Sequence, residues 1–164
     1  MTSIFLHGYG STPDSFRSKL LKAGYNLPQH SIFPSGTEED HLFGGRRWFP
    51  LSQNDEDMRS SLLDPVSQIE QLVSKNSTDH RQIELVGYSQ GGMIALEIAN
   101  RGLVRIDKVI TYASYLPAPT PPQKSRSTFC TSIEMFSSAG DFFISNSKVK
   151  NSSLYFRSEK FPNV

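Results

Sequence analysis

The sequence predicts an α/β fold in which a mostly parallel sheet is flanked by helices. Short apolar segments alternate with segments of helical periodicity, an order typical of parallel strands joined by right-handed crossovers. The pattern Gly87-Tyr88-Ser89-Gln90-Gly91 stands between an apolar run and an apolar-periodic stretch, as expected where a strand turns sharply into a helix. A glycine-containing stretch, residues 7–10, ends the first apolar segment.

Six apolar segments are predicted to be strands, because they are short and are bounded by turn-forming residues. They span residues 3–6, 31–33, 82–88, 108–113, 133–136 and 154–156. No internal repeat and no linker divides the chain, so one domain over residues 1–164 is expected.

Three segments are predicted to be helices. The first begins at residues 12–14, where a capping threonine precedes a proline, and it buries a stripe formed by Phe16, Leu20 and Leu21. The others have apolar residues at helical spacing and span residues 63–73 and 93–99. Between the second strand and the second helix, residues 36–61 are expected to form a long polar loop, of the kind that is usually functional or mobile.

The composition indicates a globular protein with little attraction for polyanions. Of the 164 residues, 37% are hydrophobic and 20% are charged, which suffices for one domain with a core. The 17 Lys and Arg residues nearly balance the 16 Asp and Glu residues, and the net charge is +1. No nucleic-acid partner is expected from that balance.

Cys130 is the single cysteine, so an internal disulfide is excluded and a reducing compartment fits best. We interpret it as a small core residue, because no histidine stands near it in the sequence. No stretch approaches the roughly 18 apolar residues of a membrane span. Residues 1–10 lack the basic and apolar regions of a signal peptide, so a cytoplasmic location is expected.

Ser89 is the candidate nucleophile. A serine at such a turn sits on strained backbone, and the positions two before and two after it need glycine because side chains would clash across the turn. The following helix points its first N–H groups at the serine, so the N–H of Gln90 is a candidate donor to a developing oxyanion. The alternative is an ordinary glycine-rich turn.

His7-Gly8-Tyr9-Gly10 is the candidate second half of an oxyanion hole. Such a hole needs a backbone donor from a loop beside the serine. The glycines allow a close approach, and the N–H of Tyr9 is the expected donor. A simple turn at the end of a strand is the alternative.

Asp141 is the candidate acid of a catalytic triad. It lies in Ser138-Ala139-Gly140-Asp141, just past a predicted strand, where a carboxylate can orient a histidine. Its position after the serine in the chain supports this interpretation. A turn aspartate is the alternative, because aspartate is common in turns.

Five motifs follow one another along the chain. They are FLHGYG at 5–10, RRWFPL at 46–51, GYSQGGMIALEIA at 87–99, SYLP at 114–117 and AGD at 139–141. Together they resemble, in content and order, the phospholipase/carboxylesterase family of α/β-hydrolases, which includes acyl-protein thioesterases and small bacterial carboxylesterases. The resemblance covers most of the chain from Ser3 to Asp141.

The resemblance implies an α/β-hydrolase-like fold and roles for individual residues. Ser89 would be the nucleophile and Asp141 the triad acid. The backbone N–H groups of Tyr9 and Gln90 would bind the oxyanion.

Three apolar residues are expected close to the substrate. The resemblance implies that Trp48 and Leu116 lie near the acyl pocket. Because their loop is polar and flanked by glycine, Trp48 and Phe49 are expected to pack beside the pocket rather than in the central core. A loop anchor without substrate contact is the alternative.

The catalytic histidine is absent from its expected place. In the family it follows the acid, whereas the four histidines here are His7, His30, His41 and His80. His7 belongs to the oxyanion loop. His30 and His80 each precede a predicted strand, so both are expected at the opposite end of the sheet. His41, on the long loop, is the remaining candidate.

Two explanations of the missing histidine are open: the chain is cut short, or it has diverged. The family needs a helix, a strand and the histidine loop where this sequence has the mostly polar residues 142–164. We therefore expect one α/β-hydrolase-like domain that lacks C-terminal elements. An uncovered sheet edge would favour self-association.

The predicted function is hydrolysis of carboxylic esters or thioesters through an acyl-enzyme, in the class of carboxylesterases, lysophospholipases and acyl-thioesterases. A small-molecule ester or thioester is the expected partner, and neither a cofactor nor a metal is expected. The rival is a non-catalytic hydrolase-like binding protein. A nucleotide-binding protein fits less well, because the glycines at 87–92 lack the lysine of a P-loop and the spacing of a dinucleotide site.

Overall fold

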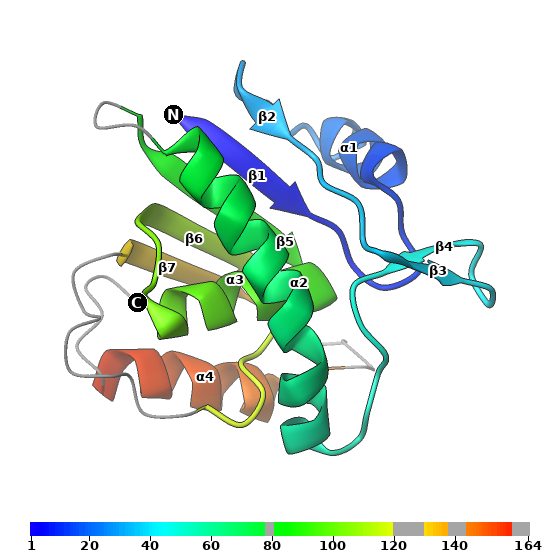
Figure 1. Cartoon of the computed structure of the whole chain (residues 1–164), viewed down its shortest axis with the longest axis vertical. Helices are drawn as coiled ribbons and strands as arrows, with labels where there is room; N and C mark the ends of the chain where they lie inside the picture. Colours follow the sequence, from blue (N-terminus) through cyan, green and yellow to red (C-terminus); the bar gives the residue numbers. More distant parts are fainter. Residues whose placement is uncertain (78–80, 120–129, 138–143, 159–164) are drawn as a thin grey trace.

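A five-stranded parallel sheet forms the centre of the molecule in the computed structural model, which describes residues 1–77, 81–119, 130–137 and 144–158 (Figure 1). The strands lie in the order β2-β1-β5-β6-β7. Their bounds are Thr2–Leu6 for β1, Ser31–Ile32 for β2, Ile83–Tyr88 for β5, Ile106–Tyr112 for β6 and Cys130–Phe136 for β7. The predicted parallel sheet flanked by helices is confirmed.

The register of the sheet aligns the carboxyl ends of four strands. Leu6 of β1 pairs with Gly87 of β5. Tyr88 of β5 pairs with Tyr112 of β6, which pairs with Phe136 of β7. The loops that leave these ends therefore meet at one edge of the sheet, which is where open α/β sheets carry their ligand sites.

Helices cover the two faces of the sheet unequally (Figure 1). The larger core lies on one face and includes residues of α2 (Asp55–Asn76), α3 (Gln90–Arg101) and α4 (Asn146–Ser158). The smaller core lies on the other face, beneath α1 (Pro13–Lys22).

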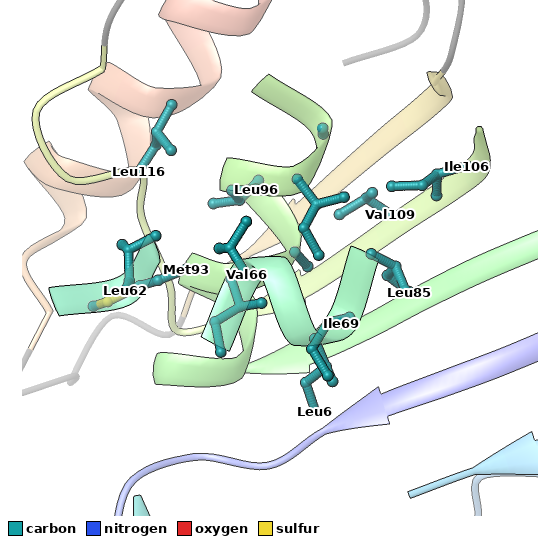
Figure 2. Packing of buried hydrophobic residues seen from close by; sticks show 14 of the residues in the cluster. Leu6, Leu62, Val66, Ile69, Leu85, Met93, Leu96, Ile106, Val109 and Leu116 are labelled. Atoms are coloured by element: carbon teal, nitrogen blue, oxygen red, sulfur yellow. The ribbon is translucent and has the colours of Figure 1, made fainter. Parts of the chain in front are cut away.

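In the middle of the sheet, neighbouring strand residues point into different cores, because successive side chains of a pleated strand face opposite sides of the sheet. In β5, Leu85 belongs to the larger core and Val86 to the smaller one. Full burial of such a side chain stabilises the fold by about 1.5–3 kcal/mol. Figure 2 shows α2 and α3 contributing neighbouring side chains to the larger core, among them Leu62, Val66, Ile69, Met93 and Leu96.

Side-chain caps fix where α1 and α2 begin. At α1, Ser15 N–H donates to Thr12 Oγ1 at 3.2 Å and Thr12 N–H donates to Ser15 Oγ at 3.0 Å, which forms a capping box. At α2, Glu56 N–H donates to Asn54 Oδ1 at 2.8 Å. The second helix therefore starts well before residue 63, where apolar periodicity alone predicts it.

The buried stripe of α1 is narrower than predicted. Phe16 is buried and Leu20 is partly buried against the smaller core, but Leu21 is 52% exposed. The prediction for Leu21 is wrong because its side chain does not reach the face of α1 that packs on the sheet.

Residues 36–61 are not one long loop, and that prediction is wrong. β3 (Glu38–Asp40) and β4 (Gly45–Arg47) form an antiparallel hairpin in this stretch, and α2 takes up its last residues. The hairpin lies beside the loop that follows β1 (Figure 1), where Arg46 N–H donates to Ser11 O at 2.8 Å. Its strands escape prediction because they carry charged side chains instead of alternating apolar ones.

The predicted strand at 154–156 is also wrong, because these residues lie in α4. The buried positions of that helix include Val149, Ser152 and Phe156. Their separations of three and four residues are helical, and Ser152 interrupts the apolar pattern that would have revealed it.

Candidate active site

Ser89 stands on strained backbone between β5 and α3. Its φ is +53° and its ψ is −116°, a conformation that costs a non-glycine residue about 1–3 kcal/mol and is concentrated at functional sites. Its N–H donates to Tyr112 O at 3.0 Å, and its carbonyl oxygen accepts from the Ser114 hydroxyl at 2.9 Å. These bonds hold the turn in place and leave the serine partly exposed.

Two glycines let the Ser89 turn close against itself and against β1. A Cβ atom on Gly91 would overlap the carbonyl group of Leu6, and a Cβ atom on Gly87 would lie 2.5 Å from Gly91 O. Both obstacles are backbone, which cannot rotate out of the way. The predicted need for glycine two residues before and after the serine is confirmed.

The loop that follows β1 lies beside Ser89. A Cβ atom on Gly8 would be 3.3 Å from Ser89 Cβ, and Tyr9 comes next in the chain. Gln90 N–H lies in the first turn of α3, where a helix supplies no acceptor. Within the described segments, neither Tyr9 N–H nor Gln90 N–H donates to a backbone carbonyl, so both remain available to a ligand at the serine.

Trp48 connects the two segments that flank Ser89. Its indole N–H donates to His7 O at 2.8 Å, and its backbone N–H donates to Gln90 Oε1 at 3.1 Å. Gln90 Nε2 in turn donates to Phe49 O at 2.7 Å. Sequence reasoning missed this role of the Gln90 side chain; the available signal was a glutamine among the small and apolar residues that open α3.

Trp48 and Phe49 lie inside the larger core, so the expectation that they pack outside it is wrong. Their side chains are 2% and 1% exposed. The Gln90 amide satisfies the backbone groups that would otherwise be buried without partners, which lets this segment enter the core. Leu116 is 3% exposed, and its N–H donates to Ser152 Oγ at 2.9 Å.

His7 is neutral and does not serve as a catalytic base. Gly36 N–H donates to its Nε2 at 2.9 Å, so the ring proton lies on Nδ1, which donates to Gly8 O at 2.8 Å. Burial lowers the pKa of His7 below its ordinary value, and the charge of Arg46 acts in the same direction. Both ring nitrogens are therefore engaged in holding the loop after β1.

Lowering the pH from about 7.5 to about 5 is expected to destabilise the fold through His7. Above the unfolded pKa of about 6.5 both states are neutral, whereas below it the unfolded chain binds this proton more readily than the folded chain, in which the pKa of His7 is lowered. One such proton gives a slope of at most about 1.4 kcal/mol per pH unit in the free energy of unfolding. Urea unfolding at the two pH values measures this slope.

Two variants separate His7 from other titrating groups in that measurement. His30 is exposed, so His30→Gln should keep the wild-type dependence on pH, and His7→Gln should lose part of it. The same dependence in all three proteins would contradict the assignment to His7.

His30 and His41, the other histidines that the structure describes, do not approach Ser89. Asp141 and His80 lie outside the described residues. His30 precedes β2, and its carbonyl accepts from Ser3 N–H at 3.0 Å, at the opposite end of the sheet. His41 lies exposed in the β3–β4 turn, lines an open cavity of about 390 Å³ that does not include Ser89, and makes no hydrogen bond or ion pair within the described part of the chain.

Cys130 is a buried member of the larger core, as predicted. Its thiol donates to Ser132 O at 3.5 Å. Burial raises its pKa to about 12, so the thiol stays protonated and unreactive near neutral pH.

Comparison with protein families gives one match over nearly the whole sequence. A family model described as phospholipase/carboxylesterase matches residues 1–158. A search of curated proteins finds no match.

Several solved structures share the fold. Arabidopsis thaliana SOBER1 has a TM-score of 0.74 at 16% identity, with 99% of this chain and 85% of that chain covered. Zea mays acyl-protein thioesterase 2 has a TM-score of 0.70 at 22% identity, with 99% and 81% covered. Bacillus cereus carboxylesterase has a TM-score of 0.76 at 17% identity, with 99% and 76% covered. At these identities the likeness shows the fold alone, which is that of the α/β-hydrolases.

Proposed function

The chain belongs to the phospholipase/carboxylesterase family, and we propose that it is a serine hydrolase of carboxylic esters or thioesters with Ser89 as the nucleophile. Family and fold make it an α/β-hydrolase of esterase or thioesterase type; the activity of this chain is what we propose. The supporting observation is the strained backbone of Ser89, which has a φ of +53° at the start of α3. Gly8 packs against this serine.

The proposed chemistry has two steps. Ser89 Oγ attacks the carbonyl carbon while a base takes the hydroxyl proton, and the alcohol or thiol leaves with that proton as the acyl-enzyme forms. Water then breaks the bond between the acyl group and Ser89 and releases the carboxylic acid. The N–H groups of Tyr9 and Gln90 stabilise the oxyanion in both steps, and Asp141 is proposed to orient the base.

A small-molecule ester or thioester is the proposed substrate, with Trp48 and Leu116 behind the acyl group. Their place in the pocket rests on the family resemblance, since both side chains are buried. None of the helices in the described ranges is both long and apolar enough to cross a membrane. We propose a cytoplasmic location, on the grounds of the single cysteine, which fits a reducing compartment.

A second candidate function is a non-catalytic protein that binds a ligand at the same site. It is favoured by two of the histidines that the structure describes: His7 has both ring nitrogens engaged, and His41 lines a cavity that does not include Ser89. A fluorophosphonate probe separates the two functions, since covalent labelling at Ser89 requires an activated hydroxyl.

Ser89→Ala is expected to remove all turnover of p-nitrophenyl esters above the uncatalysed background, however low the wild-type rate is. The variant loses the nucleophile and therefore the acyl intermediate, whereas the glycines that allow the turn are unchanged. Initial rates of p-nitrophenolate release, measured at matched protein concentration, test this.

Ser60→Ala is the matched control for that variant. Ser60 is exposed on α2 and donates only to the carbonyl of Glu56 at 3.0 Å, so its loss should leave the rate unchanged. Turnover that persists in Ser89→Ala would place the activity elsewhere and refute the proposed nucleophile.

A further inference from the structure

The two proposed oxyanion donors lie on segments far apart in the sequence. Tyr9 follows β1, and Gln90 opens α3. β1 and β5 are parallel neighbours in which Leu6 pairs with Gly87, so the sheet brings the segments together. Strand pairing fixes the positions of β1 and β5 only, and both strands end before the donor residues. The separation of the two N–H groups must therefore be set by contacts beyond the ends of these strands.

Trp48 makes such contacts with both segments. The indole N–H reaches His7 O at 2.8 Å and the backbone N–H reaches Gln90 Oε1 at 3.1 Å. All partners are buried, where a lost hydrogen bond leaves a polar group unsatisfied at a cost of about 1–3 kcal/mol. One rigid residue therefore spans the gap between the loop after β1 and the first turn of α3.

The Gln90 end of this link cannot rotate freely. Gln90 is fully buried, and its Nε2 donates to Phe49 O at 2.7 Å while its Oε1 accepts from Trp48. Two bonds to successive residues of one segment orient the whole amide. The amide is attached to the same residue whose backbone N–H is the proposed donor.

The contacts that Trp48 makes with His7 lie equally close to the other proposed donor, the N–H of Tyr9. The His7 ring lies against the Trp48 ring with centroids 4.9 Å apart, and its Nδ1–H donates to Gly8 O at 2.8 Å. The carbonyls of His7 and Gly8 thus both have fixed partners. The peptide that contains Gly8 O is the one that carries the N–H of Tyr9.

We infer that Trp48 is a positioning residue that sets the separation between the N–H groups of Tyr9 and Gln90. The inference rests on the proposed function, because an oxyanion hole needs two donors that converge to within 2.7–3.1 Å of one oxygen. Phenylalanine would keep a buried aromatic ring at this position, whereas only the indole N–H supplies the bond to His7 O. A misplacement of about 1 Å at such a site can cost on the order of 100-fold in rate.

Trp48→Phe tests this role, because it keeps a buried aromatic ring and the backbone N–H and removes the indole N–H. In ¹H–¹⁵N spectra of the full chain, the amide signals of Tyr9 and Gln90 should both shift. The Ser89-dependent turnover of a p-nitrophenyl ester should fall about tenfold, since the donors are displaced and not removed.

Phe156→Leu is the matched control. Phe156 is a fully buried aromatic residue of the same core, on α4, so its truncation lowers the melting temperature from a helix that carries neither oxyanion donor. It should leave the Tyr9 and Gln90 amides in place. If Trp48→Phe melts below the temperature of measurement, Gln90→Met cuts the other end of the link and should shift the Tyr9 amide, which it reaches through Trp48.

The turnover and the amide signals test the proposed function and the positioning role of Trp48 separately. If wild-type turnover equals that of Ser89→Ala, the proposed function is wrong, and the amide signals still report on Trp48. Tyr9 and Gln90 amides that stay unmoved in Trp48→Phe, or that move equally in Phe156→Leu, would overturn the positioning role whatever the activity.

Discussion

The 164-residue chain is expected to hydrolyse p-nitrophenyl esters about a million-fold more slowly than a serine hydrolase with a complete triad. Loss of the triad histidine costs about that much in kcat, and the oxyanion hole and substrate binding leave roughly 10³–10⁴-fold over water. His7 has both ring nitrogens hydrogen-bonded, and His41 has no carboxylate partner in the part of the chain that the structure describes. Among the residues that the structure describes, no histidine is placed to take the Ser89 proton, and a hydroxyl that keeps its proton is a poor nucleophile.

The measurement is kcat for the wild-type chain beside Ser89→Ala, His41→Ala and His30→Ala. We expect a small Ser89-dependent rate that neither histidine variant changes. His30 serves as the control, because it is exposed at the opposite end of the sheet. Turnover of ordinary size that His41→Ala abolishes and His30→Ala spares would contradict the prediction and identify His41 as an unexpected base.

The Ser89 turn could be predicted from sequence because local rules determine it. An apolar strand, glycines at the two crowded positions and a helix start are all encoded within Gly87 to Gly91. The loop after β1 follows the same logic, since Gly8 packs directly against Ser89. Close backbone contacts require glycine at particular positions, and these glycines can be recognised in the sequence.

Contacts between distant polar groups leave no such mark, and they explain what the sequence failed to predict. In α4, Lys148 Nζ donates to Asp55 at 2.8 Å and to the Tyr115 hydroxyl at 3.1 Å, and Val149 and Phe156 are buried in the larger core. Trp48 enters the core because the Gln90 amide satisfies the backbone around it. Both α4 and Trp48 depend on partners far away in the sequence. Periodicity and local composition therefore could not predict the helix α4 or the burial of Trp48.

Gly91→Ala is expected to destabilise the chain by about 2 kcal/mol. The new Cβ atom would overlap the carbonyl group of Leu6 in β1, and overpacking against backbone costs about 1–3 kcal/mol or more because neither chain can rotate away. Alanine gains up to about 1 kcal/mol over glycine in a helix, which is too little to offset the clash. For a protein of this size, such a loss lowers the melting temperature by roughly 4–8 °C.

Gly24→Ala separates the clash from the general cost of replacing a glycine. Gly24 has a φ of +79°, and no atom lies within 4 Å of the position that a Cβ would take there, so its replacement should cost only the strain of a left-handed residue, of order 1 kcal/mol. Thermal unfolding of both variants beside the wild type measures the difference. Because relief of the Gly91 clash requires the end of β1 to move, the loop at Gly8 must move with it and leave Ser89. Equal melting temperatures for the two variants would show that β1 and α3 are not in close contact at the Ser89 turn.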